Sequence, residues 1–139
     1  MTKVTLDTNI IVSGFFWKVD SSKILVLVGM SVIQNVISKE IFSEYENVCF
    51  RREINEKTSK SESDIKAFLN EMKRISDFIE PKINFDAIKN DPKDNKFLDA
   101  AYEGNVDYII TYDGHLLELG MFKGIKILTP LEFLKAINI

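Results

Sequence analysis

The sequence contains a single cysteine and a single histidine, and it lacks a long apolar run. Because Cys49 has no partner, no disulfide can form within the chain, which is typical of proteins from a reducing compartment. The longest uncharged apolar stretch, residues 24–33, is interrupted by Gly29 and Ser31, whereas a bilayer span needs ~20 residues. No basic leader followed by an apolar segment is found either. We therefore expect a cytoplasmic protein with no membrane association.

The chain also lacks an excess of positive charge. It carries 18 Lys and Arg against 21 Asp and Glu, a formal charge of −3. This balance argues against a protein that coats nucleic acid through a basic field. It leaves open an enzyme that meets phosphate groups through bound cations, because acidic ligands holding a cation reverse the local charge. With 45% hydrophobic residues, residues 1–139 are expected to form one globular domain.

Strand-like and helix-like segments alternate along the chain. Strands are predicted at 3–6, 32–37, 106–111 and 125–128, with a short strand or extended segment at 79–85. Helices are predicted at 22–30, 38–50, 61–78, 94–103 and 115–119 and after Thr129, with a buried helix or turn at 10–17 and a loop or frayed helix at 51–60. The alternation predicts an α/β fold with a mostly parallel sheet covered on both faces.

Four acids stand where burial makes a carboxylate costly. Asp7 directly follows the first strand and Asp113 follows the 106–111 strand, so both belong to the carboxyl edge of the sheet, where ligands bind. Glu44 and Asp94 lie on or beside the apolar stripes of their helices. Carboxylates gathered near an apolar interior repel one another unless a cation joins them, and hard oxygen ligands suit Mg²⁺ or Mn²⁺.

Each of these acids also has a simpler interpretation. Asp7 and Asp94 are good N-cap residues for the helices that follow them. Asp113 with Gly114 is a common turn dipeptide, and Glu44 could reach water from the edge of its stripe. The occurrence of all four together favours the metal site.

The motifs that hold these acids resemble those of PIN-domain ribonucleases. LDTN at the start, Ser38 and Glu44 in SKEIFSEYENV, then DPKDNKFLDAA and YIITYDGHLLEL follow the family's order, from about Thr2 to Thr129. The match is closest to the branch of toxins from VapC-type toxin–antitoxin pairs. The resemblance implies a three-layer α/β/α sandwich that gathers Asp7, Glu44, Asp94 and Asp113 around Mg²⁺ or Mn²⁺ and cleaves RNA. It also implies supporting roles for Asn9 and Thr111, an antitoxin partner and a homodimer.

Some positions depart from this pattern. Tyr112 stands where glycine is common and is expected to narrow the cleft, and Asn95 stands where a further acid is common. Asp91 and Asp99 are additional acids, and Asp99 is expected to face away from the site because it lies about 140° around the helix from Asp94. His115 is the only histidine and is more simply a surface residue than a general acid or base.

The expected mechanism is metal-assisted hydrolysis of an RNA phosphodiester that leaves a 5′-phosphate. Four basic residues of the 51–60 segment are weak candidates for contacts with the RNA backbone: Arg51, Arg52, Lys57 and Lys60. Three other interpretations stay open. The domain could keep the fold without turnover, or bind a partner while its acids serve only as caps and turns. A haloacid-dehalogenase-like phosphatase is disfavoured because Asn9 replaces the second aspartate of that motif.

Overall fold

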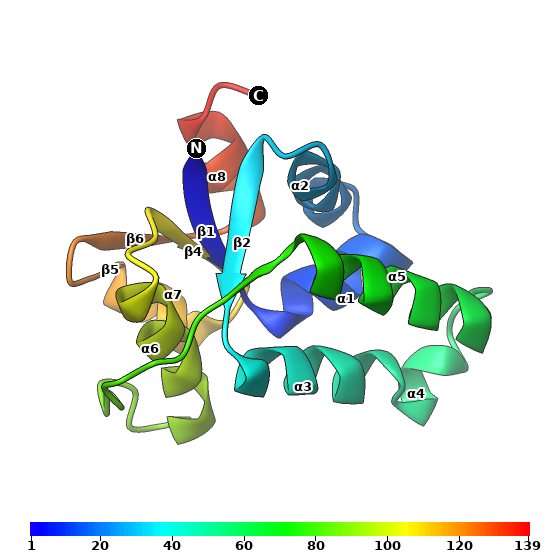
Figure 1. Ribbon diagram of the computed structural model, residues 1–139, viewed down its shortest axis with the longest axis horizontal. Helices are drawn as coiled ribbons and strands as arrows, with labels where there is room; N and C mark the ends of the chain where they lie inside the picture. The colour runs from blue at the N-terminus through cyan, green and yellow to red at the C-terminus, as the bar shows by residue number, and fades with distance from the viewer.

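The computed structural model describes residues 1–139 and contains one six-stranded sheet in the order β3-β2-β1-β4-β6-β5 (Figure 1). All pairings in the sheet are parallel except the β5–β6 hairpin. The strands are β1 (Thr2–Leu6), β2 (Ile33–Ile37), β3 (Asp77–Phe78), β4 (Tyr108–Ile110), β5 (Met121–Phe122) and β6 (Ile125–Leu128). The predicted α/β class with a mostly parallel sheet is confirmed.

Helices cover both faces of this sheet, as expected for a three-layer α/β/α sandwich. Helix α6 packs across β1, β2 and β4 on one face, whereas α2 and α8 pack together on the other (Figure 1). No helix is long and apolar enough to cross a membrane. The helices are α1 (Thr8–Phe16), α2 (Val19–Gly29), α3 (Lys39–Cys49), α4 (Arg52–Asn55), α5 (Glu62–Ile75), the 3₁₀ turn η1 (Pro92–Asp94), α6 (Asn95–Glu103), α7 (Gly114–Leu119) and α8 (Pro130–Ala136).

The chain reverses its direction across the sheet between β1 and β4. From β1 it passes through α1 and α2 to β2 on one side, and after β4 it continues to β6 on the other. In open parallel sheets, ligands bind beyond the carboxyl ends of the strands at such a switch point. Asp7 and Thr111 are the first residues after β1 and β4, and the Asp7 N–H donates to Ile110 O. The topology therefore brings these two residues together.

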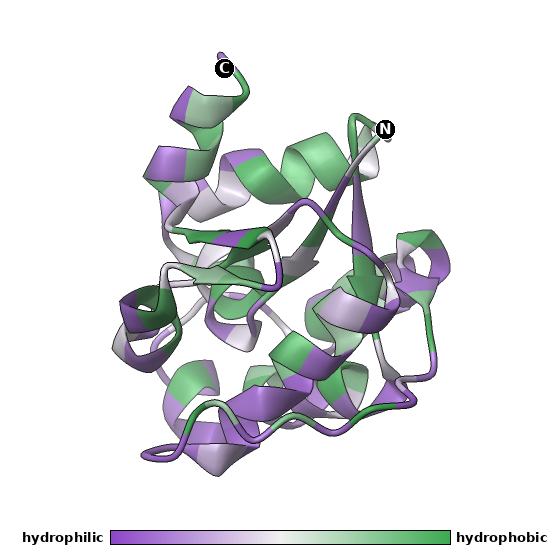
Figure 2. Cartoon of the chain, turned by 90° about the vertical axis from the view of Figure 1, so that its left-hand side faces the viewer, coloured by the Kyte–Doolittle hydropathy of each residue, from purple (hydrophilic) through white to green (hydrophobic).

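Apolar side chains of the sheet and its helices form one continuous core. The strands contribute near-continuous buried runs such as Val4 to Leu6, as expected for strands covered on both faces. The large side chains of Tyr45, Phe97 and Phe133 are fully buried among them. In Figure 2 the hydrophobic segments gather on the strands and on the helix faces turned toward them. This packing fixes the sheet edge on which the acids lie.

The starts of α3, α5 and α8 were predicted correctly because they depend on local hydrogen bonds. The start of α2 was wrong, because this helix begins at Val19, after Lys18, without a side-chain cap. The Ser38 hydroxyl accepts the Ile41 N–H, and Ser61 and Thr129 each form a complete capping box. Gly104 ends α6 as expected, but its φ is −80°, so no left-handed turn requires glycine there. A Cβ on Gly104 would lie 2.4 Å from a methyl carbon of Val36, so close packing of α6 on β2 is the reason for this glycine.

Predictions for the segment after α5 were less accurate. Helix α5 ends at Ile75 and not near Phe78, because Asp77 and Phe78 pair with β2 and the Ile79 N–H donates to Ile37 O. Residues 79–85 form no strand. Long-range pairing has here replaced the helix that the apolar periodicity favours.

The irregular segment 79–91, which we call the strap, is held by one face of α6. Three α6 side chains, one helical turn apart, accept strap backbone N–H groups: Asn95 from Ile88, Asp99 from Phe85 and Glu103 from Lys82, at 2.9, 2.7 and 3.1 Å. The Asn95 amide also donates to Ile88 O and Pro92 O, each at 3.0 Å. These bonds give a loop without regular structure a fixed path along the helix.

Candidate metal centre

Asp7 is a buried carboxylate at the switch point of the sheet. It is 4% exposed and occupies the N-cap position of α1, yet its side chain caps no amide of that helix. Its Oδ2 accepts a hydrogen bond from Thr111 Oγ1 at 2.5 Å instead. The capping interpretation of Asp7 is therefore wrong. The Thr111 hydroxyl supports this acid, in the place that the sequence motif assigned to it.

Asp113 reaches the same edge from the other side of Thr111. Its N–H donates to Thr111 Oγ1 at 2.8 Å, so a single hydroxyl links Asp7 to the Asp113 backbone. Its Oδ1 accepts the N–H groups of His115 and Leu116 at 2.7 and 3.4 Å and thereby caps α7. The interpretation of Asp113 and Gly114 as a turn is wrong, because Gly114 is the first residue of α7. Asp113 Oδ2 has no protein donor and stays available to a ligand.

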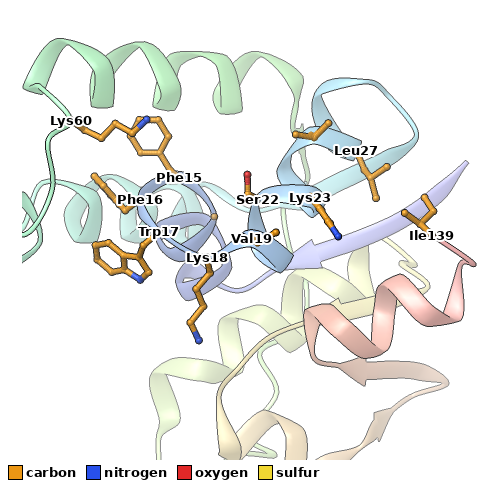
Figure 3. Close-up of a pocket in the computed structure, with 12 residues that line it drawn as sticks. Phe15, Phe16, Trp17, Lys18, Val19, Ser22, Lys23, Leu27, Lys60 and Ile139 are labelled. Carbon is orange, nitrogen blue, oxygen red and sulfur yellow. The ribbon is translucent and has the colours of Figure 1, made fainter.

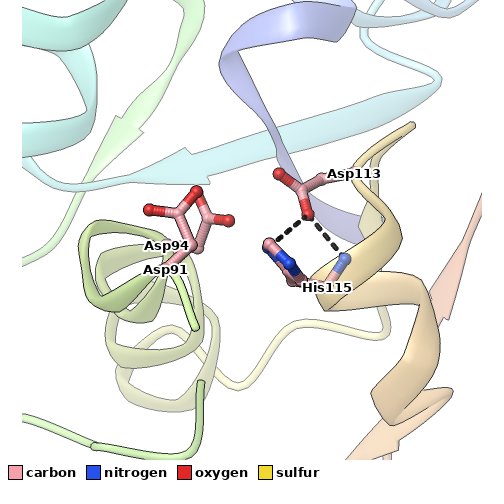
Figure 4. Close-up of side chains that lie close together, drawn as sticks. All are labelled: Asp91, Asp94, Asp113 and His115. Carbon is pink, nitrogen blue, oxygen red and sulfur yellow. Dashed lines mark hydrogen bonds and ion pairs between the residues drawn. The ribbon is translucent and has the colours of Figure 1, made fainter. Parts of the chain in front are cut away.

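Asp94 brings the second pair of acids to this edge. Ligand atoms of Asp91, Asp94, Asp113 and His115 all lie within 4.8 Å of one another (Figure 4). Asp94 is 7% exposed, it stands at the N-cap position of α6 without capping it, and its Oδ2 is buried with no hydrogen-bond partner. A buried carboxylate oxygen without a donor is costly, and a cation would satisfy it.

The electrostatics of the acids agree with this geometry. Burial raises the pKa of Asp94 to about 8, with the adjacent Asp113 carboxyl as the next cause and with Asp91 and Asp7 adding to it. Burial also raises the pKa of Asp7 to about 6, against the lowering effect of the Thr111 hydrogen bond. Without a cation, this centre holds protons near neutral pH. A divalent cation would displace them by favouring the ionised carboxylates.

Glu44 lies beside these acids and has protein partners of its own. The Thr8 hydroxyl donates to Oε1, and Lys96 Nζ forms an ion pair with Oε2 at 2.5 Å. The Glu44 charge contributes to the raised pKa of Asp7, which places it near the centre, but it is not among the four groups within 4.8 Å. Its side chain is 29% exposed, so Glu44 reaches water from the edge of its stripe, as its simpler interpretation expects, while both oxygens also have protein partners.

Lys96 is a buried residue of the site that the sequence analysis did not identify. It is 8% exposed, and its Nζ also donates to Lys93 O at 2.7 Å and lies 5.1 Å from the centroid of the Phe97 ring. Buried lysines need a partner, and Glu44 supplies it from another helix. The one available signal was a lysine at the start of the apolar run of α6, two residues after Asp94.

The remaining residues singled out from the sequence are dispersed. Asn9 is exposed on α1 and forms no hydrogen bond with the acids. Arg51 and Arg52 are exposed at the start of α4, where Arg52 pairs with Glu56 at 2.9 Å. Lys57 follows α4 and is exposed as well. Asp91, interpreted from the sequence as an additional acid, and His115, interpreted as a surface residue, lie in the cluster instead.

Tyr112 and Asn95 serve structural contacts. The Tyr112 hydroxyl lies 3.1 Å from Ser21 Oγ, so its side chain reaches α2. Asn95 holds the strap through both ends of its amide. Asp99 faces the strap and a pocket beyond it, consistent with the expectation that it points away from the acids.

An aromatic surface with three lysines begins next to the acids. Lys18 Nζ lies 4.5 Å from the centroid of Tyr112, the residue before Asp113, and from there a cavity of about 600 Å³ extends along α1 and α2 (Figure 3). We call this cavity the aromatic–lysine groove. Its principal lining residues are Phe15, Phe16, Trp17, Lys18, Lys23 and Lys60. Of the four basic residues expected to contact RNA, Lys60 is the one that borders it.

The fold and this site define an α/β domain with an acidic centre suited to a divalent cation. The chain belongs to the PIN domain family, whose model matches residues 3–115. The match spans Asp7, Glu44, Asp94 and Asp113 and ends at His115. PIN domains are typically nucleases that depend on divalent metals, and the acidic cluster agrees with that chemistry. No curated protein matches this chain.

Proposed function

We propose that this protein is an endoribonuclease that uses Mg²⁺ or Mn²⁺ to hydrolyse RNA phosphodiester bonds. The observation that carries the proposal is Asp94 Oδ2, a buried carboxylate oxygen without a partner, facing Asp113 across a cluster of further ligands. Desolvated acids with raised pKa values beside one another are typical of functional sites. The family supports a nuclease, and the resemblance of the motifs to toxin ribonucleases supports RNA as the substrate.

The donor set fits a hard divalent cation. Asp94 and Asp113 would hold it, with Asp91 and His115 in the same cluster, and oxygen ligands of this kind suit Mg²⁺ and Mn²⁺. The charge of Asp7 acts on Asp94 and Asp113 from the end of β1. The chemistry supplied by such an ion is acidification of water and neutralisation of phosphate charge. No side-chain nucleophile is then required.

The chain's own residues orient this donor set. Thr111 fixes one oxygen of Asp7 and the backbone of Asp113, and Lys96 fixes Glu44. Such supporting hydrogen bonds typically change metal affinity or activity by 10–100-fold when removed. Asp94 holds a proton near neutral pH, so loading of the centre includes loss of that proton to solvent.

The aromatic–lysine groove supports a single-stranded nucleic acid as substrate. No Asp or Glu lines it, whereas three lysines do, in a chain whose net charge is negative. Trp17 is 51% exposed and offers a face on which a base can stack. Lys18, which lines the groove, lies over the ring of Tyr112, the residue that precedes Asp113 in the chain. A strand lying in it would bring its backbone to the acids.

The test is cleavage of a labelled single-stranded RNA by the purified full chain with Mn²⁺ or Mg²⁺. A reaction in EDTA and a reaction with DNA of the same sequence are the controls. We expect metal-dependent cutting of RNA that leaves 5′-phosphate ends. Asp94→Asn should reduce the rate about 100-fold or more, since the metal site supplies several kcal/mol to the transition state.

Asp86→Asn is the matched control. Asp86 is an exposed acid paired with Lys89, and the same chemical change there should leave the rate unaltered. Products with 2′,3′-cyclic phosphate ends would contradict the mechanism. Binding of Mn²⁺ through Asp94 without cleavage of any RNA would favour a domain that has lost turnover.

We further propose that the protein acts as the toxin of a toxin–antitoxin pair, with an antitoxin partner and a homodimeric state. The similarity of its motifs to VapC-type toxins supports this role. Induced expression in bacteria should then arrest growth, and the Asp94→Asn variant should not. Normal growth with active, well-expressed protein would separate the ribonuclease from a toxin.

A further inference from the structure

A second pocket opens on the same edge of the sheet as the acids. It has a volume of about 450 Å³ and lies beyond the carboxyl ends of β2 and β3, between α3, the strap and α6. We call it the strand-edge pocket. Its main features are contributed by Ser38, Lys39, Phe78, Asn84, Lys96 and Asp99. None of the four groups of the acidic cluster lines it, so it is a separate cavity.

Asp99 is the feature that points to a ligand. It is 9% exposed, and its Oδ1 accepts the Phe85 N–H at 2.7 Å. The other oxygen, Oδ2, accepts no hydrogen bond from the protein and is accessible to solvent, and the residue lines the pocket. Burial raises the pKa of this carboxyl, and no lysine or arginine forms an ion pair with it. A fixed acceptor therefore faces the cavity without a donor.

The charge of the lining disfavours a phosphate in this pocket. Glu40, Glu80 and Asp99 contribute three carboxylates against two lysines. One of those lysines, Lys96, is already occupied by Glu44 and by Lys93 O. An anion would meet net repulsion, whereas a neutral group with N–H donors would satisfy Asp99.

The walls suit a flat, neutral group. The half-buried residues Phe78, Ile79 and Pro81 and the exposed residue Asn84 all line it. The cavity falls in the ordinary range for small-ligand sites, which combine apolar walls with a few polar groups. Unpaired RNA bases are recognised in this way, through stacking and through hydrogen bonds to their Watson–Crick edge.

We propose that the strand-edge pocket binds an unpaired guanine of the RNA substrate next to the site of cleavage. The Watson–Crick edge of guanine presents two adjacent N–H donors to Asp99 and an oxygen that Lys39 or Asn84 can bond. Adenine, cytosine and uracil each lack that pair of adjacent donors. This inference rests on the proposed ribonuclease function and adds a base preference to it.

The pocket is connected to the acidic centre through Lys96. Its side chain lines the pocket, and its Nζ contacts Glu44, whose charge acts on Asp7. Because β2 and β3 lie one and two strands from β1, at ~4.8 Å per strand, the pocket lies roughly 5–10 Å along the edge from Asp7. A base held there belongs to a nucleotide close to the cleaved bond.

The experiment measures binding of the four ribonucleoside 5′-monophosphates to the isotopically labelled full chain in EDTA, by backbone amide chemical shifts. We expect GMP to bind at least about tenfold more tightly than UMP and to shift the amides of Lys39, Phe78 and Asn84. Asp99→Asn should abolish the GMP preference while keeping an acceptor for the Phe85 N–H. Asn84→Ala, at an exposed position, should weaken GMP binding without affecting the fold, and Asp86→Asn should change nothing.

Several results would overturn the proposal. Equal affinities for the four nucleotides, shifts confined to the aromatic–lysine groove, or an unchanged preference in Asp99→Asn would each do so. Because no metal is present, these results are independent of cleavage. RNA cutting without GMP binding would reject the pocket alone, and GMP binding without RNA cutting would reject the nuclease alone. If both hold, cleavage sites should carry guanine at a fixed offset that Asp99→Asn removes.

Discussion

Lys96 Nζ lies 2.5 Å from Glu44 Oε2, so the buried lysine of α6 and the acid of α3 form one ion pair beside the metal centre. The pair joins two helices that belong to different crossovers of the sheet. The Glu44 carboxylate thus has a cationic partner from the protein, whereas no Lys or Arg forms an ion pair with Asp94.

Removing the lysine should destabilise the fold. Lys96→Met leaves Glu44 next to Asp7 without its cation, and we expect a loss of about 2–3 kcal/mol in the free energy of unfolding. Urea denaturation measures it. Adding Glu44→Gln to Lys96→Met should recover part of the loss. Lys66→Met is the matched control, because Lys66 forms an exposed pair with Glu62, worth less than about 1 kcal/mol. Equal losses at both lysines would contradict the assignment.

Asp94→Asn should stabilise the metal-free protein while removing its metal site. The pKa of Asp94 is raised from 3.8 to about 8, so the folded state binds more protons than the unfolded state between these values. The contribution of Asp94 to the free energy of unfolding therefore falls as the pH rises from 3.8 to about 8. In EDTA near neutral pH we expect the variant to gain about 1 kcal/mol or more. Thermal unfolding measures the gain, which should vanish below pH ~4. A less stable variant at neutral pH would show that Asp94 makes a favourable contact.

Metal affinity should increase with pH. Because Asp94 must lose its proton to bind a cation, the apparent Kd for Mn²⁺ should fall roughly tenfold for each pH unit below about 8 and level off above it. Calorimetry in two buffers of different ionisation enthalpy would count the protons released. A flat profile between pH 6 and 8 would exclude Asp94 from the ligands.

Thr111 should act through Asp7. Thr111→Val keeps the shape but removes the hydroxyl that donates to Asp7 and accepts the Asp113 N–H. We expect a loss of about 1–2 kcal/mol in stability and weaker Mn²⁺ binding, because the pKa of Asp7 rises further without this bond. Thr111→Ser restores the hydroxyl and should restore both properties. If the serine variant behaves like valine, packing and not the hydroxyl is the cause.

An additional acid at position 95 should not improve the metal site. Asn95→Asp replaces an amide that donates to Ile88 O and Pro92 O by an oxygen that repels both. We expect a loss of about 1–2 kcal/mol in stability and no gain in Mn²⁺ affinity. Denaturation and metal titration of the same sample test both statements. Tighter Mn²⁺ binding by the aspartate variant would restore the interpretation of this position as a missing ligand.

The sequence by itself determined the layout of the fold and two acids of the acidic cluster, Asp94 and Asp113. The helix starts at Ser38, Ser61 and Thr129 depend on hydrogen bonds within four residues, so they can be predicted from the sequence. The strands before Asp7 and Asp113 are short apolar runs whose carboxyl ends must meet at one edge once the sheet is parallel.

Only the tertiary structure decided which side chains share that edge and which partners they have. The Lys96–Glu44 pair, the place of Asp91 and His115 beside Asp94, and the contacts of Asn95 and Asp99 with the strap join residues on different elements. The apolar periodicity predicts a helix as far as Phe78, but in the structure Phe78 pairs with β2. Contacts of this kind depend on how the helices pack across the sheet. Local propensity and spacing do not encode that packing. A charged side chain is stable either in water or in an ion pair, so its residue type does not show which of the two it adopts.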